Sequence, residues 1–328
     1  MIYAIDRKSG EINWQQTAVE NLPHESTHPT GTWASNSPVT DGEHVYAYFG
    51  SQGLYCYDMQ GSLQWKSDFG DMTIKLGFGE GSSPALHNDY LVINWDHERQ
   101  SFLVALDKRT GKVRWKVKRD EKSSWSTPLI IDVNGSPQII TSATHRVRGN
   151  DLKTGALIWE CGGMTDNVIP TPISNNGTLY VTSGFRGNAL LAIRLSAAEG
   201  DITNSDAVLW RHDRDTPYTP SPLLYGNHLY FLKGNNGILT CLNAETGAPF
   251  YGPQRVEGMG DIYASPVGVD GRVYIVGRNG TTLVINHGNE YEVISRNVLD
   301  DEFSASPAIV GNEIYLRGRN ALYCIAED

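Results

Sequence analysis

The feature that most constrains the fold is a sequence repeat of about 45 residues, the length of one small supersecondary unit. Its best copies run from a short apolar strand that ends in Asp, through a turn that contains Gly, to a Trp a few residues later. The Asp carboxylate can accept N–H groups of the turn, Gly supplies the positive φ of a short hairpin, and Trp can pack against the neighbouring repeat. We therefore predict structural roles for Asp6, Gly10 and Trp14; Asp58 and Trp65; Asp107, Gly111 and Trp115; and Asp151, Gly155 and Trp159.

A second motif, Ser or Thr followed by Pro, alternates with the first. It occurs at Pro38, Pro84, Pro128, Pro172, Pro222, Pro266 and Pro307, and a strand rich in Tyr or Ile follows each copy. Together the two motifs give four strands per repeat, which is typical of the blades of a β-propeller. Helical solenoids have similar periods, but the chain has no helical periodicity. The sequence therefore predicts an all-β fold, a β-propeller of four-stranded antiparallel blades.

The phase of the repeat indicates how many blades the chain holds. Residues 2–14 read as a third and a fourth strand with no first or second, and the last unit ends after its third strand. We expect residues 1–328 to form a single propeller domain. In it, residues 1–30 are a partial first blade, and residues 31–328 are seven further blades, the last without its outer strand.

Charge and hydropathy exclude several classes of protein. The formal net charge is −10, and no segment gathers the basic residues that a nucleic-acid partner requires. No apolar stretch approaches the roughly 20 residues that cross a bilayer, and Met1 is followed at once by strand-like sequence without a signal peptide. We expect a monomer whose acidic surface serves solubility, with no nucleic acid and no transmembrane segment.

Cysteines and histidines give no sign of a metal site. Cys56, Cys241 and Cys324 occupy a repeat position that is Ala in other copies, so we expect small buried side chains there. The Cys residues lack the close pairing of a metal site. Consecutive positions on a strand cannot all face one ion, so Asp96-His97-Glu98 is expected in a solvated loop.

The candidate binding residues lie in two sets of loops. In a propeller, the loop that leads into the first strand of a blade and the loop between its second and third strands share one face, the usual ligand face. Here these loops combine aromatic rings, Arg and a few carboxylates, which suits a planar anionic ligand or a peptide strand. Alternatively, the aromatic rings fill the channel and Arg pairs with Asp at the blade edges. The candidates are Trp33, Glu80, Trp125, Asn167, Arg186, Tyr218, Asp261, Tyr263, Arg278, Glu302 and Arg317.

The repeat resembles the tryptophan-docking motif of pyrroloquinoline-quinone (PQQ) type propellers. The pattern A-x-D-x-x-T-G-x-x-x-W has good copies at Asp6–Trp14, Asp107–Trp115 and Asp151–Trp159, and the resemblance spans the whole chain. Propellers of this type usually have eight blades, so the resemblance implies an eight-bladed parent truncated at its N-terminus. It also implies a bacterial protein of the periplasm of a Gram-negative-type cell.

Two functions follow from this resemblance. Relatives include non-catalytic scaffold lipoproteins of outer-membrane assembly and planctomycete-type repeat proteins, so we expect a module that binds a protein or small ligand at its loop face. The alternative is a PQQ- and Ca²⁺-dependent dehydrogenase of alcohols or sugars, in which Trp125, Glu80, Asn167 and Asp261 take the cofactor-binding and base roles. This sequence lacks the adjacent cysteines and the haem-attachment CxxCH of many such enzymes. A separate, structural possibility is a receptor-type sensor domain cut from a larger protein.

Overall fold

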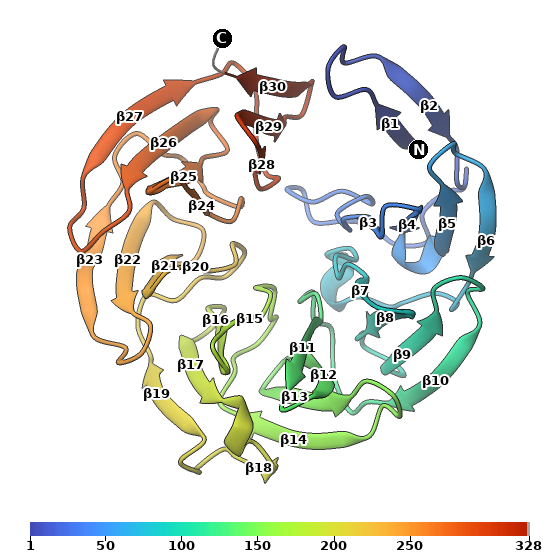
Figure 1. The fold of residues 1–328 in the computed structure, drawn as a ribbon, viewed down its shortest axis with the longest axis horizontal. Helices are drawn as coiled ribbons and strands as arrows, with labels where there is room; N and C mark the ends of the chain where they lie inside the picture. Colours follow the sequence, from blue (N-terminus) through green and yellow to red (C-terminus); the bar gives the residue numbers. More distant parts are fainter. Residues whose placement is uncertain (327–328) are drawn as a thin grey trace. The chain divides into compact units, whose positions relative to one another are not determined.

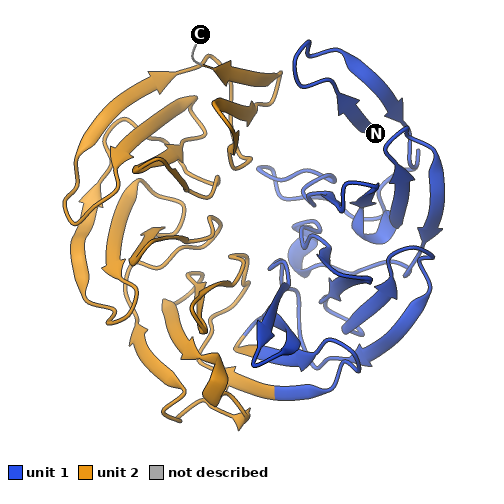
Figure 2. Ribbon diagram, viewed as in Figure 1, with its two compact units in different colours: residues 1–144, 148–158 blue, residues 145–147, 159–328 orange. Residues whose placement is uncertain are grey.

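The computed structural model describes residues 1–326 and divides into two compact units (Figure 2). Unit 1 holds residues 1–144 and 148–158, and unit 2 holds residues 145–147 and the chain from residue 159 onward. Residues 1–326 are nearly all strand, turn and loop, with three short 3₁₀ helices: η1 (Gly50–Gln52), η2 (Lys75–Gly77) and η3 (Leu195–Ala197). Over the same residues, no helix has the length and apolar character needed to span a membrane.

Unit 1 begins with a two-stranded sheet and continues in four-stranded antiparallel sheets, which we call blades (Figure 1). The unit boundary passes through the blade that contains β11 to β14. The pair at the start is the partial blade that the sequence predicts. The strands are β1 (Ile2–Ile5) and β2 (Ile12–Gln16); β3 (Val39–Thr40), β4 (His44–Tyr48), β5 (Leu54–Asp58) and β6 (Leu63–Ser67); β7 (Ala85–His87), β8 (Tyr90–Trp95), β9 (Phe102–Asp107) and β10 (Val113–Lys118); and β11 (Leu129–Val133), β12 (Ser136–Ser142), β13 (Arg146–Asp151) and β14 (Leu157–Gly162).

Unit 2 continues the same pattern and ends in a three-stranded blade. Neighbouring blades meet through their first strands, since β20 contacts both β15 and β24. The strands are β15 (Ile173–Asn175), β16 (Thr178–Ser183), β17 (Ala189–Arg194), β18 (Gly200–Asp201) and β19 (Val208–His212); β20 (Leu223–Tyr225), β21 (His228–Leu232), β22 (Ile238–Asn243) and β23 (Pro249–Arg255); β24 (Val267–Val269), β25 (Arg272–Val276), β26 (Thr281–Asn286) and β27 (Val293–Val298); and β28 (Ala308–Val310), β29 (Glu313–Arg317) and β30 (Leu322–Ala326).

Where a repeat has Asp at the end of its third strand, that Asp stabilises the turn between the third and fourth strands of the blade. The Asp151 Oδ1 atom accepts the backbone N–H of Thr154 at 2.8 Å, and Gly155 follows with φ +75°. Asp6 accepts the N–H groups of Lys8 and Ser9 in the same way, and these bonds lower the pKa of its carboxyl. The short apolar strand therefore ends at the Asp, because the backbone N–H groups that follow donate to its carboxylate and not to a neighbouring strand.

The Trp of one blade lies on the Gly turn of the next blade. The Trp210 indole N–H donates to the Ala244 carbonyl at 3.0 Å, and a Cβ added to Gly247 would lie 2.8 Å from the indole ring. The same arrangement joins three further turns, with indole N–H bonds from Trp14 to the Met59 carbonyl, Trp65 to that of Lys108, and Trp115 to that of Leu152. We call these contacts the indole seams.

The Ser or Thr before each Pro also joins neighbouring blades. The backbone N–H of Ser221 donates to Ser265 Oγ at 2.9 Å, and that of Ser265 donates to Ser306 Oγ at 2.9 Å. Equivalent bonds run from Thr171 to Ser221 in unit 2, and from Ser37 to Ser83 and Ser83 to Thr127 in unit 1. The hydroxyl thus satisfies the N–H that starts the first strand of the preceding blade.

The insertion after β17 adds a strand to the preceding blade. It forms η3 and β18, and β18 pairs in parallel with β14, with Gly200 opposite Trp159. The insertion therefore covers the outer strand of that blade, and Trp159 has no exposed surface.

The apolar core lies between neighbouring blades. Tyr46, Leu54, Ile93 and Leu106 belong to one buried cluster formed by the blades β3–β6 and β7–β10. A similar cluster joins β20–β23 to β24–β27. Each blade is therefore buried by its neighbours, as expected for a repeat that cannot hide its own apolar faces.

The prediction for the cysteines is wrong at one position. Cys56, Cys161 and Cys241 are buried, and burial raises the pKa of Cys56 and of Cys241 to about 12. Cys324, in contrast, is exposed. It lies on β30, which is an edge strand because the blade β28–β30 has three strands.

Candidate functional site

The two sets of loops meet within each blade of unit 2. In the blade β24–β27 the backbone N–H of Arg278 donates to the carbonyl of Asp261 at 2.8 Å. In the other three blades a residue of the loop that leads into the blade pairs with a residue of the loop between the second and third strands. These backbone pairs are Asp166 with Phe185, Pro217 with Gly234, and Phe303 with Gly318. The loops therefore form one surface, on which their side chains can act together.

Five of the predicted residues form a continuous group in unit 2, which we call the loop row: Asn167, Tyr218, Tyr263, Arg278 and Glu302. Burial raises the pKa of Tyr218, the Asn167 amide acts against that rise, and Tyr263 is close enough to add to it. The Arg278 guanidinium carbon lies 5.0 Å from the centroid of the Tyr263 ring. Arg278 Nη2 lies 3.8 Å from Glu302 Oε2. A planar cation, two phenols, an amide and a carboxylate are thus adjacent.

Phe185 and Arg186 extend the loop row at one end. The Phe185 ring stacks on Tyr218 with centroids 4.9 Å apart, and the Arg186 guanidinium carbon lies 5.3 Å from the Phe185 centroid. Arg186 is exposed and has φ +54°, which is unusual for a residue with a side chain. The sequence places Phe185 in a Gly-bracketed loop, and that aromatic is the one signal by which it could have been added to the candidates.

Two buried polar atoms of the loop row have no hydrogen-bond partner. They are Asn167 Oδ1 and Arg278 Nε. Asn167 is 2% exposed, so bulk solvent does not compensate for the missing bond. Buried polar groups in folded proteins are nearly always paired. An acceptor and a donor without partners in one surface favour a site that a polar ligand or an ordered water completes.

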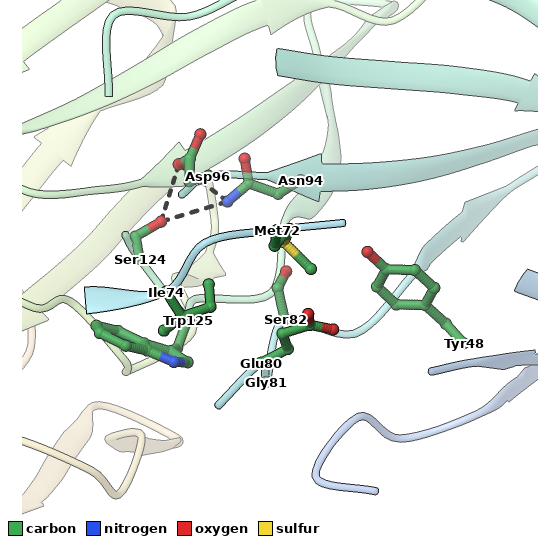
Figure 3. A pocket seen from close by; sticks show the side chains of 10 residues that line it. All are labelled: Tyr48, Met72, Ile74, Glu80, Gly81, Ser82, Asn94, Asp96, Ser124 and Trp125. Carbon is green, nitrogen blue, oxygen red and sulfur yellow. Dashed lines mark hydrogen bonds between the residues drawn. The ribbon is translucent and has the colours of Figure 1, made fainter. Parts of the chain in front are cut away.

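In unit 1, Glu80 and Trp125 line one small pocket with Tyr48, Asn94 and Asp96 (Figure 3). Its cavity measures about 10 Å³, room for about one water molecule. The Tyr48 hydroxyl and Asn94 Oδ1 are buried there without a partner. The pocket is therefore suited to a single small polar molecule.

Glu80 is held by the preceding blade. Its Oε2 atom accepts the backbone N–H of Ser51 at 2.7 Å, and its Oε1 accepts the Ser51 hydroxyl. Burial raises the pKa of Glu80, and the two bonds to Ser51 limit that rise. A Cβ at Gly50 would collide with the carboxylate, so Gly permits this close approach. The carboxylate therefore joins two blades.

The prediction of a solvated loop for Asp96-His97-Glu98 is wrong. Asp96 and His97 are 2% and 4% exposed. Asp96 Oδ1 lies 2.8 Å from Arg119 Nε in a buried ion pair, and its other oxygen accepts the Ser124 hydroxyl at 2.8 Å. Three successive polar residues in a sequence usually indicate a solvated loop. Here the buried carboxylate of Asp96 is compensated by the Arg119 guanidinium, which lies more than twenty positions away in the sequence.

The remaining candidates are Trp33, Asp261 and Arg317, of which Asp261 lies beside the loop row because its backbone carbonyl accepts the N–H of Arg278 at 2.8 Å. Trp33 is 58% exposed, and its indole N–H donates to the Glu25 carbonyl. The side chains of Asp261 and Arg317 are exposed and form no hydrogen bond or ion pair with the described part of the chain. A hollow of about 420 Å³ between β15 and β20, lined by Ile173 and Leu223 among others, includes none of the candidates.

The pocket around Glu80 does not fit PQQ with Ca²⁺. Calcium takes six to eight oxygen ligands, whereas the Glu80 carboxylate is bonded to Ser51 and the Asp96 carboxylate is paired with Arg119. A cavity of about 10 Å³ also leaves no room for a quinone beside Trp125. Within residues 1–326, no group of three or more His, Cys, Asp or Glu side chains is placed to hold a metal ion.

The sequence of this chain is similar to a known protein family and to several of its members. The family described as outer membrane protein assembly factor BamB matches residues 1–252 and 101–328. BamB of Escherichia coli (strain K12) is 24% identical over 215 residues, which are 62% of this chain and 49% of that protein. BamB of Moranella endobia (strain PCIT) is 23% identical over 273 residues, 75% of this chain and 61% of that protein. The chain thus spans between 49% and 61% of the length of these relatives.

Solved structures with the same fold include a scaffold and an enzyme. The crystal structure of BamB from Moraxella catarrhalis matches with a TM-score of 0.70 at 15% identity, over 96% of this chain and 88% of that one. A europium-containing methanol dehydrogenase matches with a TM-score of 0.68 at 11% identity, over 96% and 78%. These likenesses show the fold, a β-propeller; within residues 1–326 it has seven blades, mainly of four antiparallel strands, besides the pair β1–β2.

Proposed function

This chain belongs to the family of the outer membrane protein assembly factor BamB, and from that premise we propose that it is a non-catalytic scaffold. In this proposal the chain binds a protein partner through its loop face and serves outer-membrane protein assembly. The family match over residues 1–252 and 101–328 is the observation that carries the proposal.

The chemistry of the loop row supports a protein partner. Aromatic rings with Arg beside them are the side chains that most often anchor protein interfaces. Arg186 is exposed above Phe185, and Arg278 above Tyr263 is only partly compensated by Glu302 at 3.8 Å. An extended segment with backbone polar groups and a carboxylate would supply bonds to Asn167 Oδ1 and Arg278 Nε.

We also propose a location and an organisation. The relatives are named for outer-membrane assembly, so we place the chain in the periplasm of a Gram-negative-type bacterium. We further propose that residues 1–328 form one propeller domain and that the chain is a monomer.

A dehydrogenase is the weaker alternative. The likeness to the methanol dehydrogenase is at 11% identity and concerns the fold. In the pocket around Glu80, the carboxylate oxygens already have partners within the chain. We derive no catalytic step for this chain.

Site-specific photo-crosslinking tests the proposal. A photoreactive residue is placed at Arg186 or Arg319 at the loop face, and at Val113 on the outer strand β10 as the matched control; all three are exposed. In the native host cell, we expect defined adducts with an envelope or outer-membrane protein from the two loop positions and none from Val113. The proposal is wrong if the loop positions give no adduct, or if Val113 gives the same adducts.

A further inference from the structure

The boundary between the blades β20–β23 and β24–β27 of unit 2 lacks an indole seam. At this boundary the outer strand β23 carries Phe250 and Tyr251, where β6, β10 and β19 carry Trp. In the turn after β26, Asn289 and Glu290 stand at the positions of the usual Thr-Gly, and His287 and Gly288 come before them. The residues that close the other seams are therefore replaced on both sides of this boundary.

Tyrosine and histidine side chains close this boundary instead. The Tyr225 hydroxyl accepts the Gly271 N–H at 2.9 Å, and the Tyr230 hydroxyl accepts the Gly288 N–H at 3.2 Å. The Tyr230 hydroxyl also lies 2.9 Å from His287 Nδ1. Two backbone N–H groups of one blade thus depend on side chains of the other.

A second histidine faces the first. The rings of His228 and His287 have centroids 4.5 Å apart, and His228 also stacks on Phe250 at 4.4 Å. His228 Nε2 lies 2.8 Å from Asn289 Oδ1, which is an acceptor, so the neutral ring carries its proton on Nε2. His228 Nδ1 is buried with no partner. We call the group formed by Tyr225, His228, Tyr230, His287 and Asn289 the histidine seam.

The surroundings of the histidine seam do not compensate positive charge. The titratable groups packed around it are Tyr225 and Tyr230, with Cys241 and Tyr251 behind Tyr230. Burial raises the pKa of Tyr230, which stays neutral. Burial, and then the neighbouring His228, lowers the pKa of His287. Among residues 1–326, no carboxylate forms an ion pair or hydrogen bond with either imidazole.

From this geometry we propose that the histidine seam is a pH-sensitive joint between the blades β20–β23 and β24–β27. A proton added at His228 Nδ1 has no acceptor, and a charge on both rings places two like charges side by side. Protonation therefore favours an open joint, in which the Gly271 and Gly288 N–H groups lose their tyrosine partners.

The joint acts on the loop row because the two blades carry different parts of it. Tyr218 leads into β20–β23, whereas Tyr263 and Arg278 belong to β24–β27. Opening the joint separates Tyr218 from Tyr263, so a partner that spans both binds less tightly in acid. This second step rests on the proposed function, and the opening itself does not.

The direction of the pH effect follows from proton linkage. A histidine whose folded-state pKa is lowered contributes its full stability above its ordinary pKa of about 6.5 and loses it as the pH falls towards the lower value. The joint is therefore closed at neutral pH and opens as the solution becomes acidic.

Hydrogen exchange of the Gly271 and Gly288 amides in the whole chain tests the proposal. After correction for intrinsic rates, we expect the opening equilibrium of both amides to rise by up to about tenfold per pH unit below about pH 6.5, the limit for one linked proton. His287→Gln and His228→Gln flatten this dependence, whereas the matched control His87→Gln leaves it unchanged. No pH dependence in the unmodified chain, or the same dependence in both variants, would overturn the proposal.

One further readout keeps the test decisive. NMR titration of the unmodified chain must give His287 a pKa below the ordinary value, and a value at or above it contradicts the proposal even if the variants do not fold. Hydrogen exchange is measured without a binding partner. A failure of the crosslinking experiment would therefore count against the proposed function and not against the pH-sensitive joint.

Discussion

The blade β20–β23 has an indole seam on one side and the histidine seam on the other. On the first side, Trp210 donates one bond to the Ala244 carbonyl and covers Gly247. On the second, two tyrosine hydroxyls and two imidazoles share that role. The same four-stranded frame therefore accepts two chemistries: one closed by an indole, the other closed by tyrosine hydroxyls and imidazoles.

The largest expected difference is between the free energies of unfolding that the chain loses at pH 7 when one or the other seam is disrupted. Trp210→Ala removes a large side chain from a packed boundary, and we expect a loss of about 3 kcal/mol in the free energy of unfolding. His287→Gln keeps a polar group near Tyr230, and we expect a loss of about 1 kcal/mol. Urea denaturation at pH 7 measures both.

Val293→Ala on the exposed face of β27 serves as the control and should change the stability by no more than about 0.5 kcal/mol. An equal loss for Trp210→Ala and His287→Gln would remove the distinction between the two seams.

The glycine beneath the indole sharpens the account of that seam. Gly247 and Gly177 have φ of +71° and +77°, but an added Cβ would meet Trp210 at Gly247 and nothing within 4 Å at Gly177. Both Ala substitutions carry the backbone cost, and only Gly247→Ala displaces the indole. We expect Gly247→Ala to cost about 2 kcal/mol more than Gly177→Ala in thermal or urea unfolding. Equal costs would mean that the Trp contact adds nothing.

An indole seam in unit 1 should respond to acid in a lower pH range. Lys108 Nζ lies 2.8 Å from Asp41 Oδ2 beside the Trp65 seam. Burial alone would raise the pKa of Asp41, but the bonds from Lys108, His44, Glu43 and Tyr46 together hold it well below its usual range. The stability that Asp41 contributes is therefore present above its ordinary pKa of about 4 and is lost as the pH falls through the lower value.

The comparison of Asp41→Asn with the unmodified chain measures that contribution. We expect a difference of about 1 kcal/mol at pH 7, unchanged at pH 5 and shrinking below about pH 4. The histidine seam starts to respond at a higher pH, as the pH falls below the ordinary histidine pKa of about 6.5. A loss of the Asp41 contribution in that higher range would contradict the assignment of separate pH windows.

Local motifs were sufficient to predict the blades. The Asp, Gly and Trp spacing and the seven Ser/Thr-Pro strands give the order of the sheets, including the pair β1–β2 and the three-stranded end. These features depend on residues close together in the sequence, where turn chemistry decides the structure.

Contacts between blades were predicted less well, because their partners lie about one repeat apart. From the sequence, the Ser and Thr before each Pro indicated only where a strand begins. That their hydroxyls accept N–H groups of the preceding blade appears only in the structure. The burial of Asp96 depends on Arg119, and the exposure of Cys324 depends on the strand count of one blade. At the candidate site, loop order predicted Tyr218 and Arg278, but the unpaired atoms of Asn167 and Arg278 appear only in three dimensions.

The central claim is that the chain binds a protein and does not use a quinone. The most direct measurement is addition of PQQ with Ca²⁺, followed through quinone absorbance and dye reduction with alcohols and aldoses. We predict no saturable change in absorbance and no dye reduction. Saturable binding with turnover would contradict the account and establish the dehydrogenase alternative.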